Sequence, residues 1–347
     1  MAFSTEVIDL NDPSWIETLG PSARLVLAGG LEDNAGSLEL LSRVDPTIIP
    51  KQYLQMRDWR NWRQWALGSG VKFPSTYRVE EWMGMQDSLT VDHANNVTQP
   101  VQRWLWKKQR SAGGLGVKHV DSKELEEPSL LRANYLSASG LLQEYVSGKS
   151  IGVSFLSSHH GTVILGMAES LPLQPHIWSD FIYRGSIAPV SIPEWLVPSV
   201  GSFAKSVVNS TGWRGLWQAD FMLSESGLYL IEINPRWTAS MELIVYGYDL
   251  PLVAWHVGCG QFDGADWKRI QSKVVDAHKK TPSRFRKEIL YSIDDSVVSQ
   301  EEGEKWWGRR WIAQDCDRNG LWYADIPPAH SALTRGAPVC SVIERVV

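Results

Sequence analysis

Cysteine is scarce in this chain of 347 residues, which contains three of them. Cys259, Cys316 and Cys340 lie far apart and form no CxxC pair. Disulfide-rich secreted domains and zinc-binding modules both need closely and regularly spaced cysteines. The sequence therefore predicts neither a disulfide framework nor a zinc site.

Long apolar runs and an excess of basic residues are also missing. No run approaches the roughly 20 apolar residues of a membrane-spanning helix. The start, MAFSTEVIDLNDPS, lacks the basic residues and the apolar core of a signal peptide. With 34 Lys+Arg against 39 Asp+Glu, the net charge of −5 argues against non-specific binding to nucleic acid. We therefore expect a cytoplasmic protein with neither a nucleic-acid partner nor a membrane partner.

Apolar residues, by contrast, are plentiful, at 43% of the chain. Eighteen of the residues are tryptophans, for which buried aromatic packing is the simplest explanation. Short apolar runs alternate with Gly, Ser and Pro signals, which favours α/β or α+β domains that meet at a cleft. The pattern predicts helices near 34–43, 59–67 and 198–212, and strands at 24–31, 102–108, 117–120, 141–146, 150–158, 162–170, 217–223, 227–234, 287–293 and 338–346.

The stretch WQADFMLSESGLYLIEIN predicts two strands joined by a tight turn at 225–226. Because side chains alternate along a strand, Glu232 and Asn234 share one face. Folding places Asp220 opposite Ile231 or Glu232, with directly opposed Cβ atoms roughly 4.5–5.5 Å apart. Carboxylates this close repel each other unless a cation lies between them, and hard oxygen donors suit Mg²⁺. Asp220, Glu232 and Asn234 are therefore candidate metal ligands, with an edge hairpin of solvated acids as the alternative.

The residues after this hairpin add a cation. Pro235 has no N–H for the strand ladder, so the strand ends there and Arg236 projects into the adjacent space. A guanidinium beside a metal-bound phosphate can stabilise negative charge in a transition state. Arg236 is therefore the candidate catalytic residue. The alternative is a surface arginine that pairs with Glu242, six residues further along the sequence.

A second feature is the glycine-rich loop in WLWKKQRSAGGLGVK. Two strand-like pieces flank Ser111, Gly113, Gly114 and Gly116. Without Cβ atoms, such a loop can bring backbone N–H groups close to phosphate oxygens, and Lys107 can add a positive charge. The spacing matches neither GxxxxGK[ST] nor GxGxxG, so it favours neither a P-loop nor a dinucleotide fingerprint. An ordinary glycine hairpin is the alternative.

A third feature is the strand and Gly turn in LLQEYVSGKS. The backbone N–H and C=O groups of Gln143, Glu144, Tyr145 and Val146 can pair with the edge of an adenine. Glu144 or a neighbour can also accept a hydrogen bond from a ribose or an amino group. The strand is therefore a candidate binding segment for a nucleotide base.

Taken in order, these features resemble the ATP-grasp superfamily of ligases. That family combines a phosphate-binding lysine, a glycine-rich loop, a hinge strand for adenine and a metal-binding hairpin of the form D–F…E–x–N–P–R. Here these are Lys107, SAGGLG, QEYVSG, and Asp220-Phe221 with EINPR at 232–236. The resemblance is clearest over 72–258. Many relatives carry proline after the lysine, so Lys108 remains an alternative to Lys107.

The flanking sequences resemble a branch of ATP-dependent carboligases related to biotin carboxylase. These flanks include AGGLEDNAGSL, MRDWRNWRQW, FIYRGSIAP and the terminal ADIPPAHSALTRGAPVCSV. The resemblance implies two α+β lobes that grip ATP, and Tyr183, Arg184 and Ser240 are the implied substrate residues. Because only about 70 residues precede the grasp, the N-terminal α/β region is expected to be shortened, or its strands are cryptic.

The resemblance also implies boundaries for four regions. These are a shortened N-terminal α/β region at 1–72, a central lobe with the glycine-rich loop at 73–146, a lobe with the metal hairpin at 147–260, and a C-terminal extension packing on the grasp at 261–347.

The resemblance finally implies a reaction. An ATP-dependent ligase of this kind joins a carboxylate to an amine through an acyl phosphate and releases ADP and phosphate. The expected cofactors are ATP and Mg²⁺, with Mn²⁺ as the alternative cation, and the expected partners are small-molecule carboxylate and amine substrates. A homodimer is left open. Relatives point to one-carbon coenzyme biosynthesis of the methanopterin or methanofuran type. A small-molecule kinase and a non-catalytic nucleotide-binding module are the alternatives.

Overall fold

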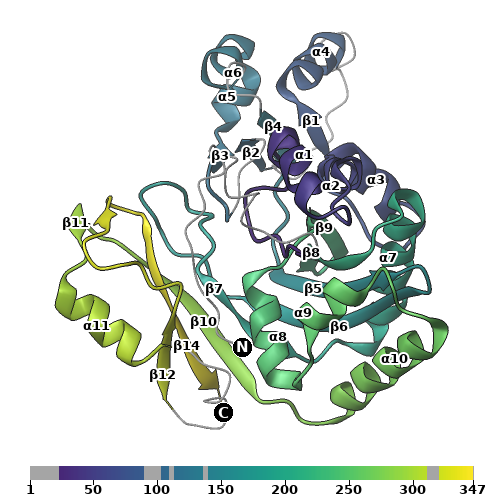
Figure 1. Cartoon of the computed structure of the whole chain (residues 1–347). Helices are drawn as coiled ribbons and strands as arrows, with labels where there is room; N and C mark the ends of the chain where they lie inside the picture. Colours follow the sequence, from purple (N-terminus) through teal and green to yellow (C-terminus); the bar gives the residue numbers. More distant parts are fainter. Residues whose placement is uncertain (1–22, 90–102, 109–112, 136–139, 311–319, 347) are drawn as a thin grey trace.

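The computed structural model of the chain describes residues 23–89, 103–108, 113–135, 140–310 and 320–346. Their elements form a larger lower lobe and a smaller upper lobe (Figure 1). The metal-ligand candidates belong to the larger lobe and the lysine candidate to the smaller one, so the arrangement of the two sheets decides whether these residues meet.

An eight-stranded antiparallel sheet forms the larger lobe. In spatial order its strands are β12 (Leu321–Ala324), β14 (Pro338–Val346), β10 (Arg284–Tyr291), β7 (Gly185–Val190), β6 (Gly161–Ser170), β5 (Lys149–Ser158), β8 (Gly215–Ser224) and β9 (Gly227–Asn234). Most of the strands expected from the sequence in this part of the chain are confirmed. The C-terminal strands continue the same sheet, and β8 and β9 form its opposite edge.

Helices cover both faces of this sheet. On one face, α7 (Val197–Thr211) and the N-terminal helices α1 (Ala35–Val44), α2 (Pro50–Arg57) and α3 (Trp59–Ala66) pack on apolar side chains of β5, β8 and β9. On the other face lie α8 (Ala239–Tyr248), α9 (Leu252–Gly258) and α10 (Gly264–Lys279). The helices expected near 34–43, 59–67 and 198–212 are confirmed as α1, α3 and α7.

The smaller lobe is a four-stranded antiparallel sheet with helices on its outer face. Its strands, in spatial order, are β1 (Thr76–Arg78), β4 (Gly140–Glu144), β2 (Trp104–Lys108) and β3 (Val117–Val120), and its helices are α4 (Val79–Leu89), α5 (Ser122–Glu126) and α6 (Pro128–Tyr135). Trp104, Trp106 and Leu142 face these helices and form their core. Because side chains alternate, Leu105 and Lys107 point to the opposite face of the sheet.

The strand expected at 24–31 is wrong. Residues 23–28 form no strand ladder, although Leu27 is buried. The Trp237 N–H donates to the Leu27 carbonyl at 2.9 Å, and the Leu25 N–H donates to a carboxylate oxygen of Asp45 at 2.8 Å. The apolar run is therefore a buried extended segment. Its backbone groups make individual hydrogen bonds to separate residues and do not pair with a neighbouring strand.

Shorter elements complete the described fold. They are the 3-10 helix η3 (Glu194–Leu196), the two-stranded ribbon β11 (Ser296–Val297) and β13 (Ala332–Leu333), and α11 (Gln300–Gly308). No helix among the described residues is long and apolar enough to cross a membrane.

The tryptophans give a test of this core. Trp217 is fully buried, stacks on Phe155 with ring centroids 4.2 Å apart, and donates to Ser157 Oγ at 2.9 Å. Trp217→Ala should lower the free energy of unfolding by about 3–5 kcal/mol, because it leaves a large cavity. Trp195, which is 63% exposed, is the matched control, and Trp195→Ala should change it by less than about 0.5 kcal/mol. Equal effects in urea denaturation would contradict this packing.

Candidate active site

The β8–β9 hairpin brings the predicted acids directly together. Its two strands are joined at residues 225–226, and the register pairs Asp220 with Glu232 and Gln218 with Asn234. Side chains paired in this way lie on one face of the sheet. Of the two pairings that the sequence allowed for Asp220, the structure has the one with Glu232.

The amide side chains hold Asp220 from two sides. Asn234 Nδ2 donates to Asp220 Oδ2 at 2.8 Å, and Gln218 Nε2 donates to Asp220 Oδ1 at 2.7 Å. Burial and the nearby Glu232 carboxylate together raise the pKa of Asp220 to about 7. Arg236 and Arg57 act in the opposite direction, and a bound cation would relieve the repulsion that remains.

A glycine on the neighbouring strand leaves room beside this pair. Gly152 of β5 lies opposite Asp220, and a Cβ at this position would be 2.7 Å from Gln218 Nε2 and 3.0 Å from Asp220 Oδ1. Any larger residue would displace the two polar side chains. Asp220, Glu232 and Asn234 together offer carboxylate and amide oxygens, which is the donor set that Mg²⁺ prefers.

This donor set contains two carboxylates and one amide. Among the described residues there is no group of three or more His, Cys, Asp or Glu side chains placed to hold a metal. Magnesium bound with a nucleotide takes only one or two carboxylates from the protein, so the hairpin fits a cation that arrives with phosphates.

Arg236 lies beside the hairpin, and its ion-pair partner is Glu32, not the Glu242 expected in the alternative. Its guanidinium forms a short ion pair with Glu32, which is 1% exposed, and Nη2 donates to Asn234 Oδ1 at 3.0 Å. Glu242 instead binds Lys287 at 2.8 Å. The expected alternative of an Arg236–Glu242 surface pair is therefore wrong, because the N-terminal segment supplies the partner.

Sequence reasoning missed a second arginine at this hairpin. Arg57, the last residue of α2, donates to Glu232 Oε1 at 2.6 Å and to the Ile233 carbonyl at 2.8 Å. Asp33 accepts two further hydrogen bonds from it. In the sequence, MRDWRNWRQW contributes to the resemblance only as a flanking stretch. An arginine at the end of a short helix carries no motif, so no local signal could have placed it here.

The smaller lobe presents Lys107 to the same hairpin. Burial lowers the pKa of Lys107 to about 8, while the Glu232 carboxylate acts in the opposite direction. The two groups are therefore close enough to interact electrostatically. Lys108 is exposed and lies on the other face of β2, next to Gly116. The geometry favours Lys107 over Lys108 as the residue that faces the space between the lobes.

The described part of the glycine-rich loop is docked on the segment before β7. Gly113 accepts a hydrogen bond from the Tyr183 N–H at 2.8 Å, and Ser179 Oγ donates to the Val117 carbonyl at 2.5 Å. Gly114 crosses so close to Phe181 that a Cβ would lie 1.7 Å from its carbonyl oxygen. Ser111, the other predicted phosphate-binding residue of the loop, lies outside the described residues.

The predicted hinge at 143–146 spans the end of β4, whose last residue is Glu144. Gln143 is buried and donates to Thr76 Oγ1 at 3.0 Å, and a Glu144 oxygen accepts from the Ser75 N–H at 3.2 Å. Tyr145 and Val146 are partly buried beyond the strand. The Glu144 side chain is therefore already hydrogen-bonded to the backbone of Ser75. Tyr145 and Val146 lie outside the strand, at the junction between the lobes.

The three predicted substrate residues fall in different surroundings. The Tyr183 hydroxyl donates to Ser186 Oγ at 3.1 Å. Burial, and to a smaller extent the Asp220 carboxylate, raises the pKa of Tyr183 to about 12. Arg184 lies 3.5 Å from Glu288. Ser240 is 4% exposed and donates to Gln218 Oε1 at 2.7 Å, so it supports the residue that holds Asp220.

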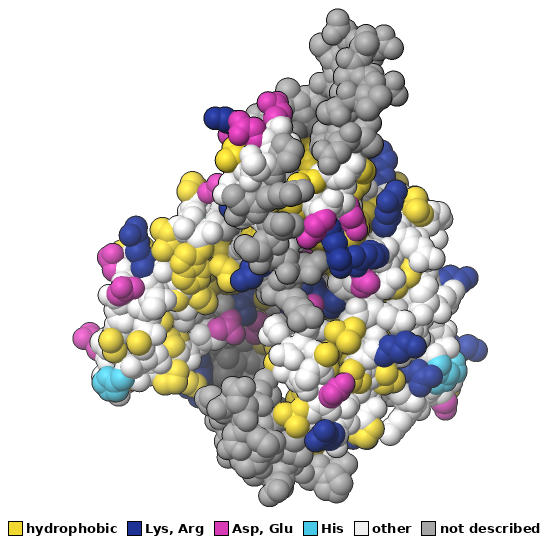
Figure 2. Space-filling view, turned by 90° about the horizontal axis from the view of Figure 1, so that it is seen from above, with side chains coloured by type: hydrophobic (Ala, Val, Ile, Leu, Met, Phe, Trp, Pro, Cys, Tyr) yellow, Lys and Arg dark blue, Asp and Glu magenta, His cyan; other side chains and the backbone are white. Residues whose placement is uncertain are grey.

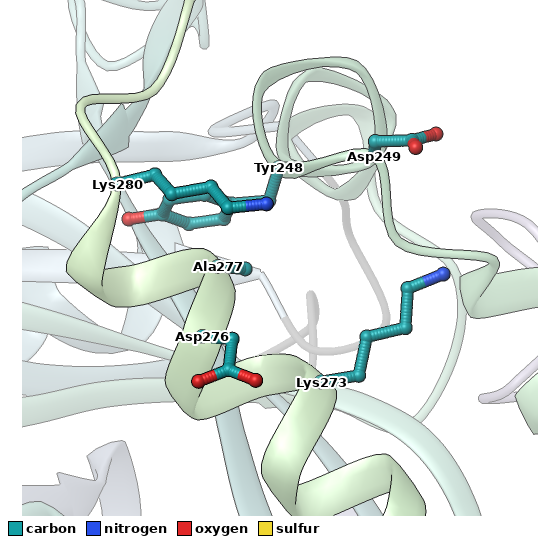
Figure 3. A pocket seen from close by; sticks show the side chains of 6 residues that line it. All are labelled: Tyr248, Asp249, Lys273, Asp276, Ala277 and Lys280. Carbon is teal, nitrogen blue, oxygen red and sulfur yellow. The ribbon is translucent and has the colours of Figure 1, made fainter.

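One face of the molecule is hollowed (Figure 2). Seen from above, a depression separates the C-terminal strands from the body of the molecule, and both acidic and basic side chains lie in it (Figure 2). A different pocket, of about 360 Å³, is lined by Tyr248, Lys273 and Asp276 among others (Figure 3). Tyr248 is eight residues along α8 from Ser240, or about 12 Å, so this pocket lies away from the hairpin.

The fold and the site together define a class: two α+β lobes with an acidic hairpin on one and a lysine and glycine loop on the other. Residues 62–240 match the ATP-grasp domain family, which is just over half of the chain. The chain belongs to the ATP-grasp domain family. The resemblance inferred from the sequence is therefore confirmed.

Curated relatives match only part of this chain. The D-alanine–D-alanine ligase of Flavobacterium psychrophilum is 29% identical over 131 residues, which is 37% of this chain and 40% of that enzyme. The same ligase from Streptomyces griseus is 26% identical over 134 residues, 37% of this chain and 34% of that enzyme. The chain thus spans well under half the length of these relatives.

Solved structures show the same fold at low sequence identity. The biotin carboxylase domain dimer of Hydrogenobacter thermophilus 2-oxoglutarate carboxylase, bound to MgADP and bicarbonate, has a TM-score of 0.62 at 15% identity and covers 92% of this chain and 69% of that one. N5-carboxyaminoimidazole synthetase of Staphylococcus aureus with ADP has a TM-score of 0.63 at 13% identity, covering 98% and 81%.

The docked loop gives a test with a matched pair of glycines. Gly113 and Gly114 both have a positive φ, of 63° and 79°, but only Gly114 has no room for a Cβ. Gly114→Ala should undock the loop and raise the hydrogen-exchange rate of the Tyr183 amide at least ~10-fold, since strain of about 1–3 kcal/mol is added. Gly113→Ala should raise it much less. Similar rates in both variants would contradict the docking.

Proposed function

We propose that this protein is an ATP-dependent ligase that joins a carboxylate to an amine through an acyl phosphate. The observation that carries the proposal is the register of the hairpin, which sets Asp220 opposite Glu232 with Lys107 of the other lobe nearby. Two carboxylates and one lysine on facing lobes suit a magnesium-bound triphosphate held between them. The D-alanine–D-alanine ligases among the relatives support this assignment.

Each lobe contributes to nucleotide binding in this proposal. Lys107 and the backbone N–H groups of the loop at 113–116 contact the phosphates, and the hinge at 143–146 contacts the adenine. Asp220, Glu232 and Asn234 would hold Mg²⁺, or Mn²⁺ as the alternative, and the cation would supply positive charge beside the phosphates of ATP. The loop already lies against 179–183, so the phosphates enter a space walled by both lobes.

The chemistry proceeds in two steps. An oxygen of the substrate carboxylate attacks the γ-phosphorus of ATP and forms an acyl phosphate as ADP leaves. The amine then attacks the carbonyl carbon, the C–O bond to phosphate breaks, and the amine nitrogen loses a proton as the amide forms. Such transfers depend on positioning and charge stabilisation, so no nucleophilic side chain is needed.

Arg236 serves the first step in this proposal. Its Nη2 is bonded to Asn234, next to the position expected for the γ-phosphate, and Glu32 fixes the other side of its guanidinium. Negative charge builds up there when the carboxylate approaches the phosphate. A preorganised guanidinium stabilises that charge at little cost in reorganisation.

The setting of the reaction is a further part of the proposal. The resemblance to the carboligase branch supports a role in one-carbon coenzyme biosynthesis, with Tyr183 and Arg184 near the substrates. The protein is proposed to act in the cytoplasm. A homodimer is proposed because the biotin carboxylase domain of similar fold is a dimer.

The function is tested by ADP release from ATP in a matrix of amino acids, pterin and furan carboxylic acids, and amines. We expect release that requires Mg²⁺ and one carboxylate–amine pair. Glu232→Gln keeps the side-chain shape but removes a charge, and should lower the rate at least ~10²-fold. A rate near that of the wild type, or release that no carboxylate stimulates, would contradict the proposal.

The pH dependence of ATP binding tests the role of Lys107. Its pKa of about 8 in the free protein means that the charge is present below pH 8 and is lost above it. ATP affinity should therefore fall as the pH rises through about 8, by up to tenfold per pH unit. Lys107→Arg stays charged and should abolish this fall, whereas Lys108→Arg should retain it. Calorimetric titration showing the reverse pattern would move the phosphate contact to Lys108.

A further inference from the structure

Arg57 ends α2 at the point where the N-terminal segment meets the hairpin. Its side chain is 9% exposed, and α2 packs against β9 and α7. Nε and Nη2 donate to the two oxygens of Asp33 at 2.8 and 2.9 Å. This bidentate pairing fixes the plane of the guanidinium, so Nη1 is held toward β9.

Nη1 contacts three consecutive residues of β9. It donates to Glu232 Oε1 at 2.6 Å, to the Ile233 carbonyl at 2.8 Å and, more weakly, toward Asn234 Oδ1 at 3.4 Å. The bond to the carbonyl ties Arg57 to the strand itself as well as to side chains. No hydrogen bond from a described residue reaches Glu232 Oε2. Arg57 thus holds one carboxylate oxygen and leaves the other available.

We propose that Arg57, held by Asp33, is a positioning residue that orients Glu232 and Asn234 for the cation of a bound nucleotide. This inference rests on the proposed function. Residues that hydrogen-bond to metal ligands fix the ligand orientation, and their loss typically costs about 10–100-fold in metal affinity. Because Asp33 and Arg57 belong to the N-terminal segment, cation binding would depend on that segment being docked on the hairpin.

A purely structural ion pair makes a different prediction. It would lower the stability of the fold when broken but leave the cation dependence of nucleotide binding unchanged. The positioning role and the structural role are distinguished by measuring the binding of a fluorescent ADP analogue. The analogue is kept at a fixed concentration while Mg²⁺ is titrated. The readout is the Mg²⁺ concentration for half-maximal binding, which needs no turnover.

Arg57→Ala should raise that concentration at least ~10-fold. Asp33→Asn, which leaves the arginine without its charged anchor, should shift it in the same direction, and Arg57→Lys should recover part of the loss. Arg60→Ala is the matched control and should have no effect, since Arg60 is an exposed arginine whose guanidinium lies 3.5 Å from Asp58 and over the Trp59 ring. Added to Glu232→Ala, Arg57→Ala should cause little further change, because the side chain that Arg57 orients is already gone.

The outcomes distinguish this inference from the function on which it rests. If Arg57→Ala does not fold, Arg57→Lys and Asp33→Asn carry the test. Wild-type protein that binds ADP without any need for Mg²⁺ would overturn both the proposed function and this inference. Mg²⁺-dependent binding that is unchanged in Arg57→Lys and Asp33→Asn would overturn this inference alone.

Discussion

The rest of the site is arranged around Asp220 and Glu232, two carboxylates that face each other across one pair of strands. Opposed like charges destabilise a hairpin unless positive charge or donated hydrogen bonds compensate them. Burial, and after it the Glu232 carboxylate, raises the pKa of Asp220 to about 7, although Arg236 and Arg57 act in the opposite direction. Positive charge thus compensates the two acids in part, and a ligand that brings a cation would add to it.

The partial compensation comes from three separate stretches of the chain. Arg57 reaches Glu232 from the N-terminal helices, Arg236 follows the hairpin itself, and Lys107 comes from the smaller lobe. The two arginines are in turn anchored by acids of the N-terminal segment, Asp33 and Glu32. The N-terminal segment therefore acts on the site through charge, although its described residues, 23–72, contribute no strand to either of the larger sheets.

A buried polar layer keeps the hairpin side chains in place. Gln218 donates to Asp220 and accepts from the hydroxyls of Ser154, Thr238 and Ser240 through its Oε1. Three donors on one amide oxygen fix which end of the side chain faces the acid. The beginning of α8 is thus connected to the acids through a single glutamine, which explains why Ser240 is buried and does not face solvent.

The sequence predicted the local geometry of the site better than its long-range contacts. The two-residue turn and the alternation along β9 follow from short-range rules, so the Asp220–Glu232–Asn234 face could be placed in advance. The Arg57 and Glu32 contacts span 175 and 204 residues, and no spacing rule reaches that far. The prediction of a strand at 24–31 is wrong because the apolar residues there reflect burial and not strand pairing.

In the proposed reaction, an oxygen of the substrate carboxylate attacks the γ-phosphate and is later lost with the phosphate. The most direct measurement uses a substrate carboxylate labelled with oxygen-18 and mass analysis of the phosphate that is released. We expect the phosphate to carry one labelled oxygen for each amide formed. Released phosphate without label would contradict an acyl phosphate and would leave ATP hydrolysis uncoupled from the carboxylate.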